Sequence, residues 1–596
     1  MKKFFSLICI TVLMCIAIFP SLSLKLNIKG QASDLFFEIQ KNSWSRAPVK
    51  TVYLPVILGN LNPNGDILLK SIEILGKNKN LLLEEKVDTS LKKVYDFAKS
   101  ADEVRKSLGI NPPSIGDLDN AKKLFIEIDK TKDKIKKNIL VEEAWQKLKY
   151  KPGDKSPDTY TEIEQKLSSL LYTKYIEIDL SKIKKDIEEE DYIPVTIRVN
   201  YEIGNTAYQA EEQTYIFYLN SLPTRTGWHP GDGHIHTQAL SNQPDDPSNY
   251  TGNYENYGFS DATDSSTILS RRNQANSFGY KWIIITDHAG EDAVAPKRLE
   301  SNEWLIYNTA CTRAMSNYFP NITVCPGEEL AMVEGTTSWT DPRSGHYLTY
   351  KNSSYVASYA TACYELIQRS YNAGGFGVIA HPYNTFFHWG DWSATSQNGF
   401  TELEIISNQS DYSQNAINKW DELLTANLEN IIYGGPKIIG MANSDVHNST
   451  YMWGLNMNYI YTGSSNPPGT DRTAIYNNLK AGRVTASSDG SLAVFSLNGY
   501  APGSVVNVNP GTNNVSITVS GKCISTAYPY IYVYIFSNNG TQVLYDSFYD
   551  LDTDFNKTYQ LTATADCYYR VLVTFKDQSG AVKGYCLISP VYVNLP

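Results

Sequence analysis

The chain of 596 residues holds only 8 histidines, and seven of them fall between positions 229 and 388. Six histidines stand in short polar motifs with carboxylates: GDGHIHT (231–237), ITDH (285–288), PGEEL (326–330), GHYL (345–348), AHP (380–382) and NSDVH (443–447). Imidazoles and carboxylates together suit Zn, Mn or Fe, and a carboxylate can bridge two ions. The pattern therefore predicts a centre of two or three divalent metal ions, Zn, Mn or Fe.

Two histidines, His229 and His388, lie outside these motifs, and a structural role in packing or hydrogen bonding is the simpler interpretation for them. Aromatic residues crowd the same part of the chain: Trp228, Tyr383, Phe386, Phe387, Trp389 and Trp392. They predict either core and rim packing or a wall for a flat or sugar-like substrate. The sequence leaves both interpretations open.

Between residues 226 and 465, short apolar runs alternate with helix-like segments. WIIITDH (282–288), FGVIAHP (376–382) and IIGMANSDVH (438–447) each end in polar residues. Buried strands that alternate with helices indicate a parallel sheet or barrel, whose chemistry lies at the carboxyl ends of the strands. His234 and His236, two apart in an extended segment, are expected to face the same side.

Taken in order, the six motifs resemble those of the PHP family, the polymerase and histidinol phosphatase metal-dependent phosphoesterases. Farther on, LKAGRVTASSDG (479–490) and SPVYV (589–593) look like the β-sandwich tail of secreted members grouped with a carbaryl hydrolase. The resemblance implies an α/β fold with a distorted (β/α)7 barrel at 226–465. It also implies a hydrolytic activity that depends on metal ions.

The resemblance implies up to three metal positions. The first ion would be held by four residues: His234, His236, Glu329 and Asp445. The second would share Glu329 and add His346 and His381. The third would use His288, His447 and Asp261. A long loop separates His236 from Asp261, so Asp245 and Asp246 are alternatives for that last ligand.

Other polar residues of the motifs would act around the ions. The candidates for the general acid that protonates the leaving group are His288, His447 and a metal-bound water. Asp287 is expected to orient or hydrogen-bond rather than to ligate. Glu328 is expected to face solvent or to support a ligand, and Glu404 in TELEIISN to support a ligand.

The favoured function is a secreted phosphoesterase in which a hydroxide between two ions attacks phosphorus in a small-molecule substrate. One alternative is a metal-dependent hydrolase of an ester, amide or carbamate bond, which the tail's resemblance motivates. Another is a non-catalytic surface protein that binds glycans or mediates adhesion, which the flanking sandwiches motivate.

The first 23 residues have the pattern of a secretory signal peptide. Lys2 and Lys3 precede an apolar stretch from Phe4 to Phe19, and Ser21 and Ser23 offer a cleavage site. We therefore expect a secreted protein with no membrane span in the mature chain. Export would leave six cysteines, of which the last three, Cys523, Cys567 and Cys586, could supply one disulfide; buried free thiols are the alternative.

The regions around the expected barrel differ in composition. Residues 24–225 predict a β-sandwich-like domain with a Lys/Glu-rich helical insertion at about 85–190, and residues 466–596 predict a linker and a C-terminal β-sandwich. Up to residue 225 the chain has 34 Lys plus Arg against 31 acids, and beyond it 19 against 32. The net charge of −10 argues against nucleic acid as the main partner.

Overall fold

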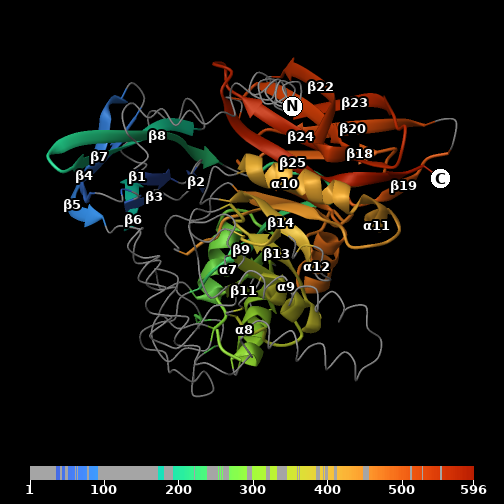
Figure 1. Cartoon of the computed structure of the whole chain (residues 1–596), viewed down its shortest axis with the longest axis horizontal. Helices are drawn as coiled ribbons and strands as arrows, with labels where there is room; N and C mark the ends of the chain where they lie inside the picture. Colours follow the sequence, from blue (N-terminus) through green and yellow to red (C-terminus); the bar gives the residue numbers. More distant parts are fainter. Residues whose placement is uncertain are drawn as a thin grey trace, which may run out of the picture.

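The computed structural model of the chain (Figure 1) describes most of residues 35–91, the segments 172–179 and 192–219, and most of 222–595. The longer stretches outside the described residues are 1–34, 92–171, 180–191, 238–252, 260–266, 291–298, 332–344 and 448–455. The expected signal peptide and most of the expected helical insertion lie outside the described residues. The described parts of that insertion, 85–91 and 172–179, are strands rather than helices.

The N-terminal part forms two sheets that share one core. Its strands are β1 (Leu35–Ile39), β2 (Ser43–Arg46), β3 (Thr51–Asn60), β4 (Ile67–Leu75), β5 (Leu81–Leu91), β6 (Tyr172–Asp179), β7 (Tyr192–Ile203) and β8 (Thr206–Leu219). They pair in the orders β1-β3-β6 and β2-β8-β7-β4-β5. Alternate residues such as Leu54, Ile72 and Val199 point into the common core, as the two-residue period of a strand requires. The arrangement is sandwich-like.

The middle of the chain builds the long sheet that carries the histidine motifs. Its strands are β9 (Trp228–Ile235), β10 (Trp282–Ile285), β11 (Thr323–Ala331), β12 (His346–Tyr350), β13 (Phe376–Ala380), β14 (Phe400–Ser407), β15 (Ile439–Asn443), β16 (Met457–Tyr461) and β17 (Val484–Ser487). Hydrogen bonds connect them in the order β15-β14-β13-β12-β11-β10-β9-β16-β17. Several are buried along their whole length, which explains their continuous apolar character.

The expected distorted (β/α)7 barrel is wrong. Among the described residues the strand order is an open path that begins at β15 and runs on through β17 into the C-terminal sheet. Strand β12 is antiparallel to both of its neighbours, β11 and β13, and β16 is antiparallel to β9. Apolar periodicity identified the strands, but it does not specify direction or partner, which depend on contacts between distant segments.

The C-terminal part adds a second sandwich-like pair of sheets. Its elements are β18 (Leu492–Leu497), β19 (Val505–Asn507), β20 (Asn514–Lys522), β21 (Tyr530–Ser537), η6 (Asn538–Gly540), β22 (Thr541–Tyr549), β23 (Asp554–Thr562), β24 (Cys567–Lys576) and β25 (Val582–Asn594). One sheet has the order β18-β20-β23, and the other continues the long sheet as β17-β25-β24-β21-β22, with β19 also on β25. Val519, Val533 and Val573 belong to the core that both share.

The described α-helices all lie between residues 268 and 480 of the sequence (Figure 1). They are α7 (Ile268–Ser277), α8 (Trp304–Ser316), α9 (Cys363–Asn372), α10 (Ser413–Ala426), α11 (Leu428–Ile432) and α12 (Arg472–Lys480). Helix α10 is fastened to the C-terminal sheet because the buried carboxylate of Asp421 accepts hydrogen bonds from Arg570 Nε (2.6 Å) and Tyr568 Oη (3.0 Å). None of the described helices is both long and apolar enough to cross a membrane.

Candidate metal centre

Strand β9 and the loop after β15 bring the first and last histidine motifs together. His234 lies in β9 and His236 just beyond its end, and both side chains are fully buried. The His236 N–H donates to the Val446 carbonyl (3.0 Å), and Asp232 Oδ1 accepts from the backbone N–H groups of His234 (3.0 Å) and Ser444 (3.2 Å). Segments that are about 200 residues apart in sequence are thereby locked into one site.

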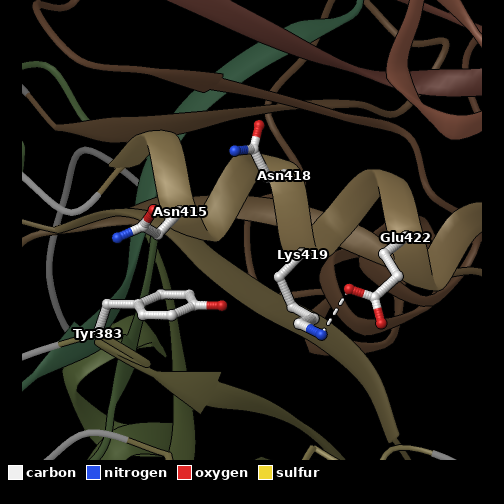
Figure 2. Close-up of a pocket in the computed structure, with 5 residues that line it drawn as sticks. All are labelled: Tyr383, Asn415, Asn418, Lys419 and Glu422. Atoms are coloured by element: carbon white, nitrogen blue, oxygen red, sulfur yellow. Dashed lines mark hydrogen bonds and ion pairs between the residues drawn. The ribbon is translucent and has the colours of Figure 1, made fainter. Parts of the chain in front are cut away.

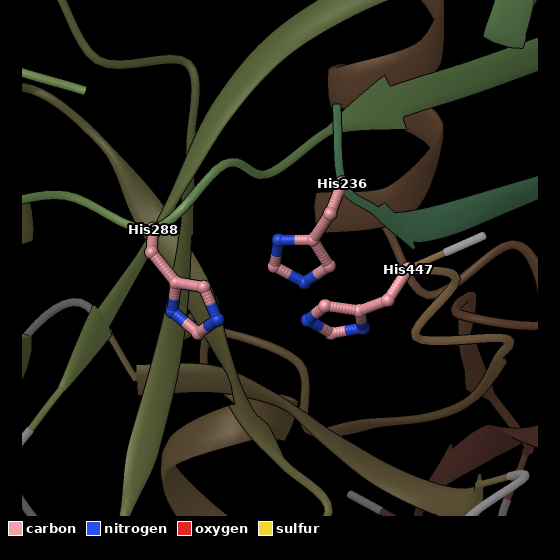
Figure 3. Close-up of side chains that lie close together, drawn as sticks. All are labelled: His236, His288 and His447. Carbon is pink, nitrogen blue, oxygen red and sulfur yellow. The ribbon is translucent and has the colours of Figure 1, made fainter. Parts of the chain in front are cut away.

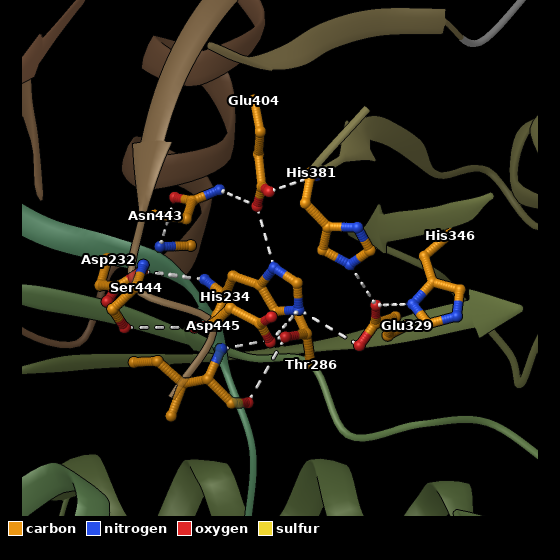
Figure 4. A network of polar contacts seen from close by, with 12 residues as sticks. Asp232, His234, Thr286, Glu329, His346, His381, Glu404, Asn443, Ser444 and Asp445 are labelled. Carbon is orange, nitrogen blue, oxygen red and sulfur yellow. Dashed lines mark hydrogen bonds and ion pairs between the residues drawn. The ribbon is translucent and has the colours of Figure 1, made fainter. Parts of the chain in front are cut away.

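Four side chains of this site, His234, His236, Glu329 and Asp445, converge on one point, and Figure 4 shows His234, Glu329 and Asp445 of them. His234 Nε2 lies 3.2 Å from Glu329 Oε2 and 3.1 Å from Asp445 Oδ1. His236 Nε2 lies 3.1 Å and 3.3 Å from the same two oxygens. Two ligand atoms that are each about 2.1 Å from a shared tetrahedral ion are about 3.4 Å apart. The spacing of these atoms therefore fits a single cation among them.

The hydrogen bonding of His236 gives an independent test of that fit. Nδ1 has no hydrogen-bond partner among the described residues, although the side chain is completely buried, and Nε2 faces the same two carboxylate oxygens. Buried polar groups in proteins nearly always have partners, so an orphaned imidazole requires an explanation. A cation between His236 and the two carboxylates would bind the imidazole through Nε2, and the buried cluster of His, Glu and Asp could hold a metal ion.

Glu329 presents its second oxygen to a second group. Oε1 lies 2.6 Å from His346 Nδ1 and 3.4 Å from His381 Nε2, whereas Oε2 faces His234 and His236. A single carboxylate thus has one oxygen in each of two adjacent ligand groups. This is the geometry expected of a carboxylate that bridges two ions.

Three histidines form a third group (Figure 3). The ring centroid of His236 lies 4.0 Å from that of His447 and 4.7 Å from that of His288. His447 Nδ1 donates to the Asp445 carbonyl (3.0 Å), which leaves the lone pair on Nε2 for a cation. A neutral imidazole has only one lone pair, so His236 cannot complete this group while it serves the first one.

The expected third ligand of this group, Asp261, and its alternatives Asp245 and Asp246 lie outside the described residues. Of the nine expected ligands, the other eight come together in the three groups just described.

Glu404, on β14, organises two of the ligands without joining any group. Its Oε1 accepts from His234 Nδ1 (2.9 Å) and from Asn443 Nδ2 (2.8 Å), and its Oε2 accepts from the His381 backbone N–H (2.6 Å). Because the ionised carboxylate can only accept, Nδ1 of His234 carries the proton and Nε2 offers the lone pair. The bond to His381 also holds a residue whose φ of +27° is rare outside glycine.

The buried carboxylates of the cluster need positive charge close by to balance them. Burial acts to raise the pKa of Glu329, but the surrounding histidines, His288 and His346 first among them, hold it well below its usual range. Burial acts to lower the pKa of His236, but the Asp445 and Glu329 carboxylates raise it to about 9. Without a cation, protons on the imidazoles would balance the carboxylates, so protons and metal ions compete for the same atoms.

The acidic neighbours of the ligands have supporting roles. Asp287 accepts from the Thr237 N–H (2.6 Å) and the Thr237 hydroxyl (2.7 Å), and so fixes the backbone just after His236. Glu328 is fully buried and accepts from Asn352 Nδ2 (2.9 Å) and the Val356 N–H (3.1 Å), so the solvent-facing alternative is wrong. Burial raises the pKa of Glu328 well above its usual range.

Several residues of the site escaped the sequence analysis. Asp232 could have been found, because it stands two positions before His234 in the same extended motif. Arg271, fully buried on α7, donates through Nε to the His236 carbonyl (2.7 Å), and nothing in its sequence neighbourhood indicates this role. Asn458 Nδ2 donates a hydrogen bond to Asn443 Oδ1 (2.8 Å), and Asn458 belongs to strand β16, which contains none of the six motifs.

Among the described residues, His229 and the six cysteines belong to none of the three ligand groups. His229 Nε2 contacts Thr462 Oγ1 (3.1 Å) and the Ser464 carbonyl (3.0 Å), consistent with a structural role, and His388 is outside the described residues. The six cysteines after the expected signal peptide are all buried and free. The disulfide considered for the last three is therefore not formed, and the free-thiol alternative holds.

Comparisons with known proteins do not assign a family. No family model and no curated protein matches the chain. Among solved structures, the CARDB domain of a Pyrococcus furiosus protein, in complex with di-metal ions, is 19% identical and aligns with 18% of this chain and 96% of its own length, with a TM-score of 0.13. A glycosyl hydrolase family 2 member from Bacteroides cellulosilyticus is 8% identical over 95% of this chain and 63% of its own, with a TM-score of 0.15.

The Parabacteroides merdae beta-glucuronidase is 9% identical over 94% of this chain and 65% of its own, with a TM-score of 0.14. Scores this low carry no argument about the fold or the function of the chain. Any functional conclusion therefore depends on the chemistry of its own residues.

Proposed function

We propose that this chain is a secreted metal-dependent hydrolase, and that it acts as a phosphoesterase on a small-molecule substrate. The observation that carries the proposal is the position of Glu329, which turns one carboxylate oxygen toward His234 and His236 and the other toward His346 and His381. A carboxylate shared between two cation sites suits in-line displacement at phosphorus. The six ordered motifs that resemble the PHP phosphoesterases support the same choice.

The residues present would hold at least two divalent ions, Zn, Mn or Fe. When bound, such ions acidify a water molecule and stabilise negative charge on the phosphoryl oxygens. The chain's own contribution is to set the ligands in place: Glu404 fixes the tautomer of His234, and Asp287 fixes the backbone after His236. Because these groups are buried, the charges act in a medium where electrostatic effects are stronger than in water.

His447 is the best placed of the histidines to give a proton to the leaving group. Its side chain is 24% exposed, whereas the side chains of His288 and His346 are 7% and 8% exposed. A leaving group departs toward solvent, so the most exposed of these three histidines can reach it. We assign the general acid to His447, which in this role carries a proton on Nε2 rather than binding a cation there, and a ligand role to His288.

The test begins with the metal content of the purified chain and its turnover of phosphomonoesters, phosphodiesters and aryl esters with added Mn or Zn. We expect bound metal and hydrolysis of a phosphoester. His381→Ala and Asp445→Ala are expected to abolish turnover, while circular dichroism shows the fold retained.

Each other outcome selects a different function. Cleavage of an ester, amide or carbamate but of no phosphate compound would assign the site to the second class of hydrolase. Metal content below one ion per chain together with no turnover would refute both hydrolase assignments and leave the glycan-binding or adhesion protein.

A further inference from the structure

A pocket of about 410 Å³ lies between Tyr383 and helix α10 (Figure 2). Five residues line it: Tyr383, Asn415, Asn418, Lys419 and Glu422. Tyr383 comes two residues after His381, and two residues of chain span at most about 7 Å. The backbone of Tyr383, which lines the pocket, therefore lies close to that of His381, a candidate ligand of the metal centre.

One side of this pocket is aromatic. Trp392 stacks on Tyr383, with ring centroids 5.5 Å apart and planes 27° apart, and both side chains are partly exposed. Lys419 Nζ lies 5.2 Å from the centre of the Trp392 ring. A fixed aromatic face that stays open to solvent can pack against the CH groups of a ring-shaped ligand.

The opposite side offers hydrogen-bonding groups of both kinds. Asn415 and Asn418 are exposed on α10, one helical turn apart, so their amides face the same side. Gln414 Nε2 donates to Asn418 Oδ1 (2.8 Å), which fixes the orientation of that amide and directs its Nδ2 away from the bond.

The charges in the pocket cancel. Lys419 Nζ lies 2.6 Å from Glu422 Oε2, so the only described cation among the lining residues is already paired. A phosphate or carboxylate would have to compete with Glu422 for that ammonium group. A neutral ligand rich in hydroxyl groups would meet no such repulsion, and each hydroxyl can both donate and accept.

We propose that this pocket binds the neutral sugar portion of a phosphorylated saccharide, whose phosphoryl group is held at the metal centre. The inference rests on the proposed phosphoesterase function and adds the class of substrate. The aromatic face contacts the sugar ring, and Asn415, Asn418 and Tyr383 bind its hydroxyls.

The first test measures sugar binding alone, without metal and without turnover. Ligand-observed NMR on the full, metal-free chain with D-glucose, D-mannose and N-acetyl-D-glucosamine should show saturable binding of at least one sugar, with a dissociation constant of the order of 1 mM. Tyr383→Ala and Asn418→Ala should each weaken that binding about tenfold. Tyr433→Ala is the matched control, because Tyr433 is an aromatic residue that is 73% exposed and lies outside the pocket.

Absence of binding for all three sugars would overturn the proposal, and so would binding that survives both pocket substitutions. Because this measurement needs neither metal nor turnover, it can fail or succeed separately from the proposed hydrolytic function.

The second test asks whether the sugar belongs to the substrate. On the Zn- or Mn-loaded chain, kcat/KM is measured for glucose 6-phosphate and for methyl phosphate, which has no sugar. Hydrolysis of methyl phosphate reports the phosphoesterase activity itself. Tyr383→Ala should lower the ratio of the two kcat/KM values about tenfold, whereas Tyr433→Ala should leave that ratio unchanged. An unchanged ratio in Tyr383→Ala would show that the pocket does not serve the substrate and would overturn the proposal.

Discussion

The substitution Glu404→Gln tests whether the centre depends on a residue that touches no ion. The carboxylate of Glu404 accepts three hydrogen bonds, from His234 Nδ1, Asn443 Nδ2 and the His381 N–H. Glutamine has nearly the same shape, but one of its two terminal atoms is a donor. The substitution therefore changes the hydrogen bonding and leaves the packing almost intact.

The magnitude follows from these three bonds. If the glutamine oxygen keeps the bonds to His234 and Asn443, its NH₂ group faces the N–H of His381, and two buried donors oppose each other. A buried group left unsatisfied costs about 1–3 kcal/mol, and His381 is already in a costly conformation at φ +27°. We expect metal affinity to fall about 10–100-fold, the range typical of residues that support metal ligands.

The assay is a competition for Zn between the chain and a chromophoric chelator, with elemental analysis of the purified protein. Glu402→Gln is the control, because Glu402 is two residues earlier on β14, is equally buried, and has no hydrogen-bond partner among the described residues. Burial raises the pKa of Glu402 well above its usual range, so glutamine replaces a neutral acid there. Equal affinities of Glu404→Gln and the wild-type chain, or equal losses in both variants, would refute the reasoning.

Three further predictions concern stability. Burial raises the pKa of Asp489 to about 6 in the folded chain, above about 3.9 in the unfolded chain, so the folded state holds the proton more tightly. The free energy of unfolding should then fall by up to about 3 kcal/mol as the pH rises from about 4 to about 6, and Asp489→Asn should remove this fall in urea titrations. Asp421→Asn leaves the buried guanidinium of Arg570 without its counter-charge, and urea titration should show a loss of about 3 kcal/mol; a loss below about 1 kcal/mol would contradict a buried pair. Zn at 100 times its dissociation constant should raise the free energy of unfolding by about 2.7 kcal/mol, and a chelator should reverse the rise in a thermal melt; an unchanged melt would contradict a site formed only in the folded chain.

Residue type and order were sufficient to select most of the members of the candidate site. His234 and His236 were expected on one side of an extended segment, and both reach the same pair of carboxylate oxygens. Glu329 was separated from its neighbour Glu328 only by the family resemblance, since both are buried glutamates on β11. Nothing in the sequence could indicate Arg271, because its contact is with a backbone carbonyl that every residue carries.

The fold was harder to predict than the site. The apolar runs before His288, His381 and Asp445 are strands β10, β13 and β15, as expected from their composition. The sheet they form was mispredicted because β12 is antiparallel to both of its neighbours, and because β17 pairs with β25 of the C-terminal sheet. A polar motif at the end of a strand depends on local pattern, whereas the partners of strands β10, β13 and β15 come from segments about 20 to 50 residues away.

Two residues of the cluster have unusual backbone conformations that hydrogen bonds hold in place. His381 and Asp445 both have positive φ, +27° and +52°, just past the ends of β13 and β15. Residues other than glycine rarely adopt this region, so surrounding hydrogen bonds must hold the backbone there. The His381 N–H donates to Glu404, and the Asp445 carbonyl accepts from His447 Nδ1. Each of these two ligands is therefore fixed by a hydrogen bond to another residue of the cluster, which His381 donates and Asp445 accepts. The metal affinity of such a centre should depend on these hydrogen bonds as well as on the ligands themselves.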